Sequence, residues 1–223
     1  MNNTNQILVL NDVNKTYDNG LVVALDEVSF SINEGEVVSI TGPSGCGKST
    51  LLNLIGSLDN LTSGEIFFQG RRIRDHKPLN RFRAKNIGFI FQFHHLIPTM
   101  TLLENVEIQM IPLGIPRNIR TQKATSILSV LGLDGRKNFL PVRTSGGERQ
   151  RAAIARALVH EPKLILADEP TGNLDTDNSD QAINHIISLC RQIGATAIIA
   201  THNPDVAFRA DRSIRIKNGK IEE

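Results

Sequence analysis

The chain has 223 residues and a mass of 24.6 kDa, and its 40% hydrophobic and 22% charged residues exclude intrinsic disorder. Its 25 Lys and Arg residues against 23 Asp and Glu residues leave a formal net charge of +2, which argues against a polycation acting on nucleic acid. Because Cys46 and Cys190 follow no disulfide spacing and no apolar run approaches roughly 18 residues, we expect a protein of a reducing cytoplasm with neither secretory signal nor membrane span.

The N-terminal part of the sequence is typical of antiparallel strands. Residues 6–13 and 21–32 carry alternating or mixed apolar patterns. Asn19-Gly20 lies between them and is a strong hairpin signal. These segments predict an N-terminal antiparallel β-subdomain.

Short apolar strands alternate with helical segments along the rest of the chain. The further predicted strands are residues 37–41, 64–70, 87–92, 163–168 and 195–201, and the predicted helices are residues 49–58, 124–133 and 148–160. The runs 87–92, 163–168 and 195–201, separated by helical segments, are typical of a mostly parallel sheet with flanking helices in an α/β domain. Because residues 93–160 hold no good strand, we expect a helical subdomain there, inserted within a single domain 1–223 that ends in a hairpin at Asn218-Gly219.

Residues 42–50, GPSGCGKST, match the pattern G-x-x-x-x-G-K-[ST] between an apolar strand and a helix. Glycines let successive N–H groups point at phosphate oxygens, and the helix start adds its positive dipole end. We expect Lys48 to reach the β- and γ-phosphates and the Ser49 hydroxyl to bind Mg²⁺. The pattern therefore predicts a site for ATP and Mg²⁺ formed by Gly42, Pro43, Ser44, Gly45, Cys46, Gly47, Lys48, Ser49 and Thr50.

The apolar run 164–167 ends in two carboxylates, Asp168 and Glu169. Beside a phosphate-binding loop, Asp168 is suited to hold the Mg²⁺ shell. Glu169, one residue further, is suited to orient an attacking water or take its proton. A polar strand end without a ligand is the alternative interpretation.

Two further polar residues stand at predicted strand ends. Gln92 ends the run 87–92, and His202 follows the run 195–201. Ligands of open parallel sheets bind outside the carboxyl ends of the strands, so we expect Gln92 to contact the metal ion and its water and His202 to contact the γ-phosphate. Purely structural roles for both remain open.

Residues 145–147, Ser-Gly-Gly, directly precede an amphipathic helix and form a second helix start suited to an anion. One chain already has a phosphate-binding loop, so this second start needs its own explanation. If it faces the nucleotide of another copy, the active form is a head-to-tail pair with two ATP molecules between the subunits. A helix cap without a ligand is the alternative.

Together these motifs resemble the ATP-binding subunits of ABC transporters, over essentially the entire chain. The resemblance implies an ABC-type P-loop NTPase core in which Gln92 is the Q-loop glutamine, Glu169 the catalytic carboxylate and His202 the switch histidine. It also implies a signature formed by Ser145, Gly146, Gly147 and Glu148, a D-loop ending at Asp175, and Tyr17 as the aromatic that stacks on adenine. A buried strand tyrosine is the alternative for Tyr17. The chain departs from the usual signature at Thr144, where Leu is common, and at Glu148, where Gln is common.

Several segments are most similar to the lipoprotein-releasing and macrolide-export branch of this family, among them residues 87–106 and 167–175. That resemblance implies a peripheral ATPase on the cytoplasmic face of the inner membrane. Its expected partners are a second copy of itself and integral membrane permease subunits, and no nucleic acid. Two alternatives remain: the ATPase subunit of a transmembrane regulator of cell-wall hydrolysis at division, and a soluble ABC ATPase of DNA repair or translation.

Overall fold

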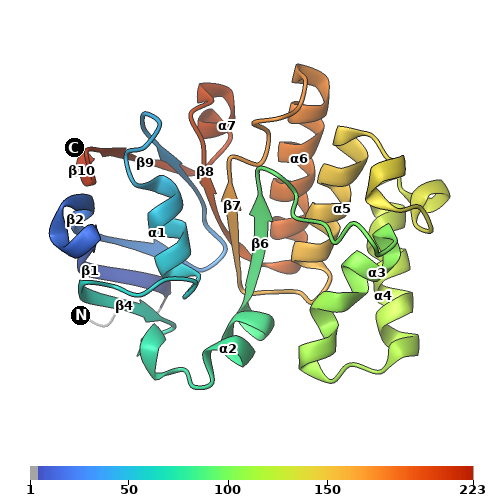
Figure 1. Ribbon diagram of the computed structural model, residues 1–223, viewed down its shortest axis with the longest axis horizontal. Coiled ribbons are helices and arrows are strands. Elements are labelled where there is room, and N and C mark those ends of the chain that lie inside the picture. Colours follow the sequence, from blue (N-terminus) through green and yellow to red (C-terminus); the bar gives the residue numbers. More distant parts are fainter. Residues whose placement is uncertain (1–4, 223) are drawn as a thin grey trace. The chain divides into compact units, whose positions relative to one another are not determined.

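The computed structural model describes residues 5–222, and its first sheet is antiparallel (Figure 1). Its strands are β1 (Gln6–Tyr17), β2 (Val22–Asn33), β4 (Ser63–Phe68) and β5 (Arg71–Arg72), in the order β2-β1-β4-β5. A 3₁₀ turn, η1 (Asp18–Gly20), joins β1 to β2, and Asn19 in it has a φ of 55°. The predicted N-terminal antiparallel subdomain and its hairpin are confirmed.

The second sheet contains the predicted strands 37–41, 87–92, 163–168 and 195–201, whereas the predicted strand 64–70 is β4 of the antiparallel sheet. The members of the second sheet are β3 (Val37–Thr41), β6 (Ile87–Phe91), β7 (Leu164–Asp168), β8 (Thr196–Ala200), β9 (Arg212–Lys217) and β10 (Lys220–Glu222), in the order β10-β9-β3-β8-β7-β6. β3 runs parallel to both β8 and β9, whereas β10 pairs antiparallel with β9. The α/β fold class and the C-terminal hairpin are confirmed, apart from Glu223, which lies outside the described residues.

By its internal contacts the chain divides into two compact units. The first unit comprises residues 1–80, 166–168 and 196–223, and the second comprises residues 81–165 and 169–195. The first unit contains the antiparallel sheet, strands β3, β8, β9 and β10, and helices α1 (Lys48–Ile55) and α7 (Pro204–Phe208). The leucine and isoleucine side chains of α1, on its buried face, belong to the core of this unit.

The second unit is mainly helical. Its helices are α3 (Leu102–Glu107), α4 (Arg117–Val130), α5 (Gly146–Leu158) and α6 (Thr176–Ile193), while α2 (Leu79–Asn86) spans the boundary with the first unit. Short 3₁₀ segments complete the chain: η2 (Ile73–Asp75), η3 (Ile108–Leu113), η4 (Asp134–Arg136) and η5 (Pro141–Arg143). α5 packs against α3, α4 and α6 (Figure 1). Its alanines at 152, 153, 155 and 157 are buried, which allows these helices to approach closely.

The predicted helices differ from the observed ones in their bounds, and the largest difference is at α4. The sequence pattern predicts a helix over residues 124–133, but α4 begins at Arg117, directly after Pro116, and ends at Val130. Its first turns are polar, with Thr121, Gln122 and Lys123, so they carry no hydrophobic periodicity. α6 is the longest helix of residues 5–222, and none of the helices in this range is long and apolar enough to cross a membrane.

Gly88, in β6, lies where its backbone touches neighbouring parts of the second unit. A Cβ at this position would collide with the carbonyl oxygen of Ala157 and lie 2.6 Å from Cδ1 of Ile165. We expect Gly88→Ala to lower the free energy of unfolding by about 2 kcal/mol, because the packed core has no room for it. Gly135→Ala is the control, since a Cβ there meets nothing within 4 Å. Urea unfolding that gives both variants equal stability would contradict this packing.

Candidate functional site

The loop between β3 and α1 follows a course that depends on its glycines. Gly42, Gly45 and Gly47 have φ angles of +146°, +76° and +108°, which L side chains rarely adopt. A Cβ on Gly42 would also collide with the carbonyl oxygen of Ile216, and one on Gly47 with that of Ala24. The predicted arrangement of strand, glycine loop and helix is therefore present in the first unit.

Lys48, the first residue of α1, holds its ammonium against this loop. The side chain is buried, and Nζ donates hydrogen bonds to the carbonyl oxygens of Gly42 at 2.8 Å and Pro43 at 3.0 Å. Of the other predicted loop residues, four are exposed: Pro43, Ser44, Gly45 and Ser49. Three are half-buried, Gly42, Gly47 and Thr50, and Cys46 is buried. The loop thus offers its main chain, the Lys48 ammonium and the Ser49 hydroxyl, which are the groups that bind a triphosphate and its Mg²⁺ in loops of this pattern.

His202 follows β8 and is exposed. The preceding residue, Thr201, is buried and donates its N–H to the carbonyl oxygen of Ile40 at 3.0 Å, so the strand ends are held together. A depression of about 850 Å³ in the first unit is lined by Gly42, Pro43 and His202. The structure therefore brings His202 and the glycine loop to one surface, as expected for neighbouring ends of parallel strands.

Asp168 is the last residue of β7 and is half-buried. Its carboxylate and the Ser49 hydroxyl are the hard oxygen ligands that Mg²⁺ prefers. Within residues 5–222 no group of three or more His, Cys, Asp or Glu side chains is arranged to hold a metal ion. A Mg²⁺ ion usually keeps several waters and takes its remaining ligands from phosphates, so this donor set fits an ion that arrives with its nucleotide.

Tyr17, the last residue of β1, has 38% of its surface exposed. It pairs with Val22 across the hairpin, and its phenol donates a hydrogen bond to Oδ2 of Asp59 at 2.8 Å. A buried strand tyrosine, the alternative interpretation, is therefore not what the structure contains. The ring is accessible to a planar ligand.

In the second unit, Gln92 lies against the segment that follows Glu169. The carbonyl oxygen of Gln92 accepts a hydrogen bond from Nδ2 of Asn173 at 3.0 Å. Its side-chain amide lies so near Gly172 that a Cβ there would be 2.8 Å from Nε2. Residues that are about 80 positions apart in the sequence are thus neighbours at the ends of β6 and β7.

Glu169 begins a tight turn directly after β7. Its φ of 45° is in the left-handed region, and its carbonyl oxygen accepts the N–H of Gly172 at 3.1 Å. The side chain is half-buried. A non-glycine residue in this conformation is held by its surroundings, and such strain is concentrated at functional sites.

The signature residues form the start of α5. Ser145 is the N-cap: its hydroxyl accepts the N–H of Glu148 at 3.2 Å, and Oε2 of Glu148 accepts the N–H of Ser145 at 2.7 Å. Oε1 of Glu148 pairs with Nε of Arg136 at 3.0 Å. The hydrogen bond from Ser145, opposed by burial and assisted by Arg136, holds the pKa of Glu148 below its usual range. Glu148 therefore completes a capping box, and Ser145 stays exposed at its tip.

Thr144, the second departure from the usual signature, is buried. Its hydroxyl donates a hydrogen bond to the carbonyl oxygen of Pro141 at 2.8 Å, and its carbonyl oxygen accepts one from Nη1 of Arg149 at 2.6 Å. Thr144 thus anchors the segment before α5 by polar contacts, where a leucine would do so by apolar packing.

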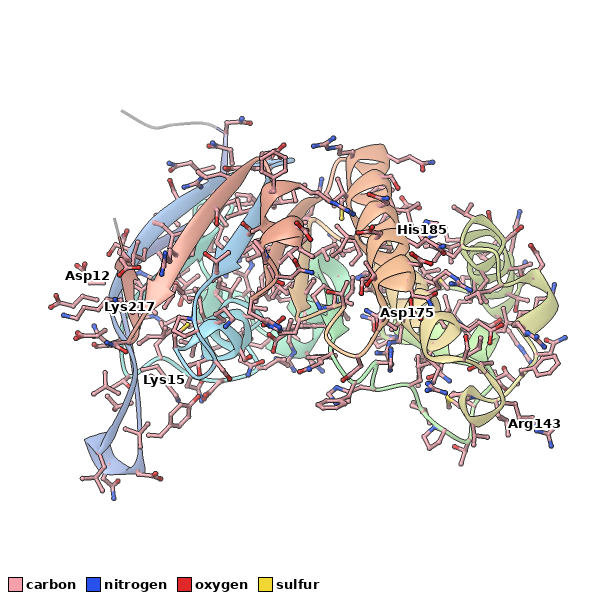
Figure 2. The ribbon with its side chains drawn as sticks, turned by 90° about the horizontal axis from the view of Figure 1, so that it is seen from above. Asp12, Lys15, Arg143, Asp175, His185 and Lys217 are labelled. Carbon is pink, nitrogen blue, oxygen red and sulfur yellow. The ribbon has the colours of Figure 1, made fainter. Side chains whose placement is uncertain are left out.

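The D-loop lies beside the signature in this unit. Asp175 caps the N-terminus of α6, the helix that also carries His185, and its carboxylate accepts the N–H and the side-chain amide of Asn178 at 2.9 Å (Figure 2). Those bonds hold the pKa of the exposed Asp175 below its usual range. A Cβ on the buried Gly147 would collide with the side-chain oxygen of Asn178. Gly147 is therefore required for the close approach of α5 to α6.

The capping box predicts different effects for two substitutions of Glu148. Glu148→Gln keeps an acceptor for the N–H of Ser145 and loses only the ion pair with Arg136, so we expect a stability loss of less than about 0.5 kcal/mol. Glu148→Ala loses both contacts, and we expect a loss of about 1 kcal/mol. Thermal unfolding of the two variants measures the difference. Equal losses would show that the box contributes nothing to the stability of α5.

A protein-family model described as "ABC transporter" matches residues 25–172, which include the glycine loop, the signature and the pair Asp168-Glu169. The chain belongs to the ABC transporter family. It is an ATP-binding subunit with ATPase activity, as its motifs indicated, and the resemblance stated from those motifs is confirmed.

Relatives of this ABC ATPase support the branch that the motifs suggested. The lipoprotein-releasing system ATP-binding protein LolD of Roseobacter denitrificans is 40% identical over 225 residues, which cover 99% of both chains. An uncharacterized ABC transporter ATP-binding protein of Thermotoga maritima is 43% identical and covers 97% of this chain and 94% of its own. Among solved structures, the dimeric post-hydrolysis state of the ATP-binding cassette MJ0796 bound to ADP and Pi has a TM-score of 0.89 at 40% identity, with 97% of each chain covered.

Some residues around these motifs were not expected from the sequence. Asp59 bonds Tyr17, Arg136 pairs with Glu148, and Asn178 packs on Gly147. No motif assigns a role to any of these three residues. Lys15, which also bonds Asp59, could have been placed beside Tyr17 from the sequence, because residues two apart on a strand share a face.

Proposed function

We propose that this ABC ATPase works as a pair of copies on the cytoplasmic face of the inner membrane and drives a separate membrane subunit in lipoprotein release or a related export reaction. The observation that carries the proposal is the similarity to a protein named LolD over 99% of both chains. In the proposed machine a separate membrane subunit supplies the membrane-spanning part.

The proposed nucleotide site assigns a role to each polar group. In the first unit the glycine loop and Lys48 bind the phosphates, Ser49 and Asp168 hold Mg²⁺, and His202 contacts the γ-phosphate. In the second unit Glu169 orients and deprotonates the attacking water, and Gln92 senses the metal and its water. When bound, Mg²⁺ would supply positive charge that offsets the charge on the phosphates during in-line attack by water.

The paired state explains the exposed helix start at Ser145. Its capping box satisfies the N–H groups of Ser145 and Glu148 and leaves the tip of the helix at the surface, where the positive end of the dipole favours an anion. We propose that this tip caps the γ-phosphate of ATP held by a second copy. The similar cassette MJ0796 was solved as a dimer bound to ADP and Pi, which supports a pair here.

Isolation of the native complex tests the proposal. A tagged chain is purified from its own membranes with ATP, beside a Lys48→Ala control that is expected to bind nucleotide poorly. The co-purified membrane protein is then reconstituted with the chain in proteoliposomes loaded with a lipoprotein. We expect release that requires ATP and is lost in the control. A membrane partner that activates cell-wall hydrolysis and releases no lipoprotein would contradict the transport proposal.

A further inference from the structure

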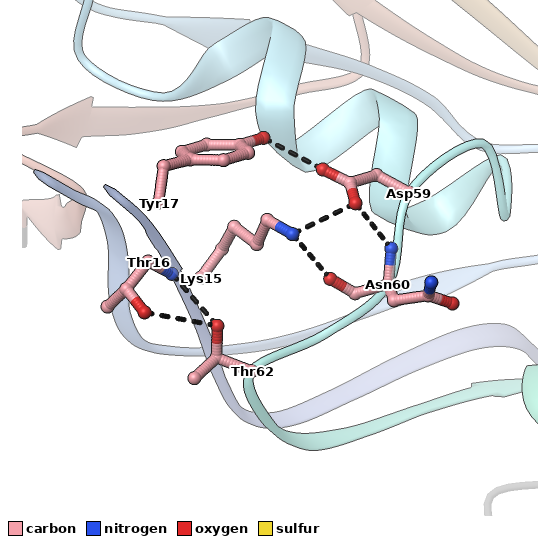
Figure 3. A network of polar contacts seen from close by, with 6 residues as sticks. All are labelled: Lys15, Thr16, Tyr17, Asp59, Asn60 and Thr62. Atoms are coloured by element: carbon pink, nitrogen blue, oxygen red, sulfur yellow. Dashed lines mark hydrogen bonds and ion pairs between the residues drawn. The ribbon is translucent and has the colours of Figure 1, made fainter. Parts of the chain in front are cut away.

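Tyr17 is held by a polar network that no nucleotide motif contains (Figure 3). Its hydroxyl donates to Oδ2 of Asp59 at 2.8 Å, while Oδ1 of the same carboxylate accepts Nζ of Lys15 at 2.9 Å. Nζ of Lys15 also donates to the carbonyl oxygen of Asn60 at 2.9 Å, and the N–H of Asn60 bonds Oδ1 of Asp59 at 2.6 Å. The phenol and the ammonium are thus fixed to a single carboxylate.

Lys15 also covers one face of the tyrosine ring. The two residues are two apart on β1, so their side chains lie on the same side of the strand. Nζ lies over the ring at 4.6 Å from its centroid, within the range of a cation–π interaction. Lys15 itself is buried, with 11% of its side chain exposed. A planar ligand that stacks on Tyr17 therefore has to approach the opposite face.

The charge states of the network agree with this arrangement. Burial alone would raise the pKa of Asp59, but hydrogen bonds from Lys15, Tyr17 and the N–H of Asn60 hold it below its usual range. Burial and the carboxylate of Asp59 raise the pKa of the Tyr17 phenol, opposed by Thr50 and Lys15. At neutral pH the contact is therefore a phenol that donates to a carboxylate.

Asp59 joins the ring to the segment that follows α1. Asp59 lies in the segment between α1 and β4, and α1 begins at Lys48, which closes the loop. A tyrosine at a strand end next to a turn would otherwise choose among several rotamers and lose that freedom when a base stacks on it. Fixing the rotamer beforehand removes this cost from binding.

We propose that Asp59 and Lys15 are positioning residues that hold the Tyr17 ring, with one face covered, as the platform for the adenine base. The proposal rests on the proposed role of Tyr17 in stacking on adenine. It adds that the chain's preference for a base-bearing ligand over a bare triphosphate depends on a carboxylate that never touches the nucleotide.

Binding of ATP and of inorganic tripolyphosphate, measured by calorimetry on the full chain, separates the base from the phosphates. We expect Tyr17→Ala to weaken ATP binding by roughly ten- to hundredfold and leave tripolyphosphate unchanged. Asp59→Asn is expected to weaken ATP binding by about three- to tenfold, also without an effect on tripolyphosphate. In the Tyr17→Ala background, Asp59→Asn should cause no further loss.

Tyr17 provides its own spectroscopic signal, because it is the only tyrosine of the chain and there is no tryptophan. The tyrosinate absorbance of the protein therefore reports the pKa of this one phenol. We expect Asp59→Asn to lower that pKa towards its ordinary value. Tyr17→Phe keeps the ring and removes the hydrogen bond, so it should reproduce most of the Asp59→Asn loss in ATP affinity if the Asn variant folds poorly.

Asp12→Asn is the matched control. Asp12 is an exposed aspartate of β1, the strand that carries Lys15 and Tyr17, and its carboxylate accepts a hydrogen bond from Ser29. It should change neither ligand's affinity. Two results would overturn the positioning role alone. One is a loss of tripolyphosphate binding in Asp59→Asn, and the other is an Asp59→Asn loss of ATP affinity that is as large in the Tyr17→Ala background as in the wild-type chain. Unchanged ATP affinity in Tyr17→Ala would overturn both the positioning role and the proposed stacking on adenine.

Discussion

Replacing Glu169 with Gln is expected to lower kcat for ATP hydrolysis by at least about 100-fold, because a positioned general base typically contributes 10²–10⁴-fold. The substitution removes the carboxylate's basicity and keeps its size. Since the turn is held by the backbone bond from Gly172 to Glu169, we expect the local structure to persist. Steady-state hydrolysis and equilibrium ATP binding measure the two effects, and ATP affinity should stay within about twofold.

The same variant should accumulate a nucleotide-bound dimer, because ATP that closes the pair is no longer hydrolysed to open it. Size-exclusion chromatography with ATP would detect it. Glu161→Gln is the matched control: Glu161 is a glutamate of the second unit that also has a left-handed φ, 54°, but its exposed carboxylate pairs with Lys123 at 2.8 Å. Wild-type hydrolysis in Glu169→Gln would remove Glu169 from the role of base.

Introducing Arg at Ser145 is expected to abolish ATP-dependent dimerisation and to lower hydrolysis by at least about 100-fold. Ser145 is exposed at the start of α5, and a long side chain there would occupy the space that a partner's nucleotide needs in the proposed pair. Loss of the N-cap by itself should cost only about 1 kcal/mol of stability, so the monomer should remain folded. Sedimentation with ATP and hydrolysis assays over a range of protein concentrations measure the effect.

A second capping box within the same unit supplies the control for Ser145→Arg. Thr101 caps α3 with Glu104 in the same geometry, so Thr101→Arg removes a cap and adds the same side chain elsewhere. We expect that variant to lose similar stability but to keep ATP-dependent dimerisation. If Ser145→Arg hydrolyses ATP normally at low protein concentration, the two-copy site is wrong.

The sequence by itself predicted the elements whose cause is local. The glycine loop 42–47 could be predicted because Gly42, Gly45 and Gly47 have φ angles that favour glycine. The strand 37–41 could be predicted because a short apolar run bounded by turn residues is typical of a buried strand. α3 was not predicted although Thr101 and Glu104 form a capping box, because the helix has six residues and continues as a 3₁₀ segment that contains Pro112. Too few residues repeat there for a helical period to be visible.

The tertiary structure alone decided the contacts around the motifs. Tyr17 meets Asp59 across 42 positions of sequence, and Gln92 meets Asn173 across 81, although no motif assigns a role to Asp59. Such pairs depend on which strand ends and loops the packed core brings together, and a short-range pattern carries no information on that. A motif therefore names the groups that would touch a nucleotide, whereas the residues that fix their orientation are chosen by packing between distant segments.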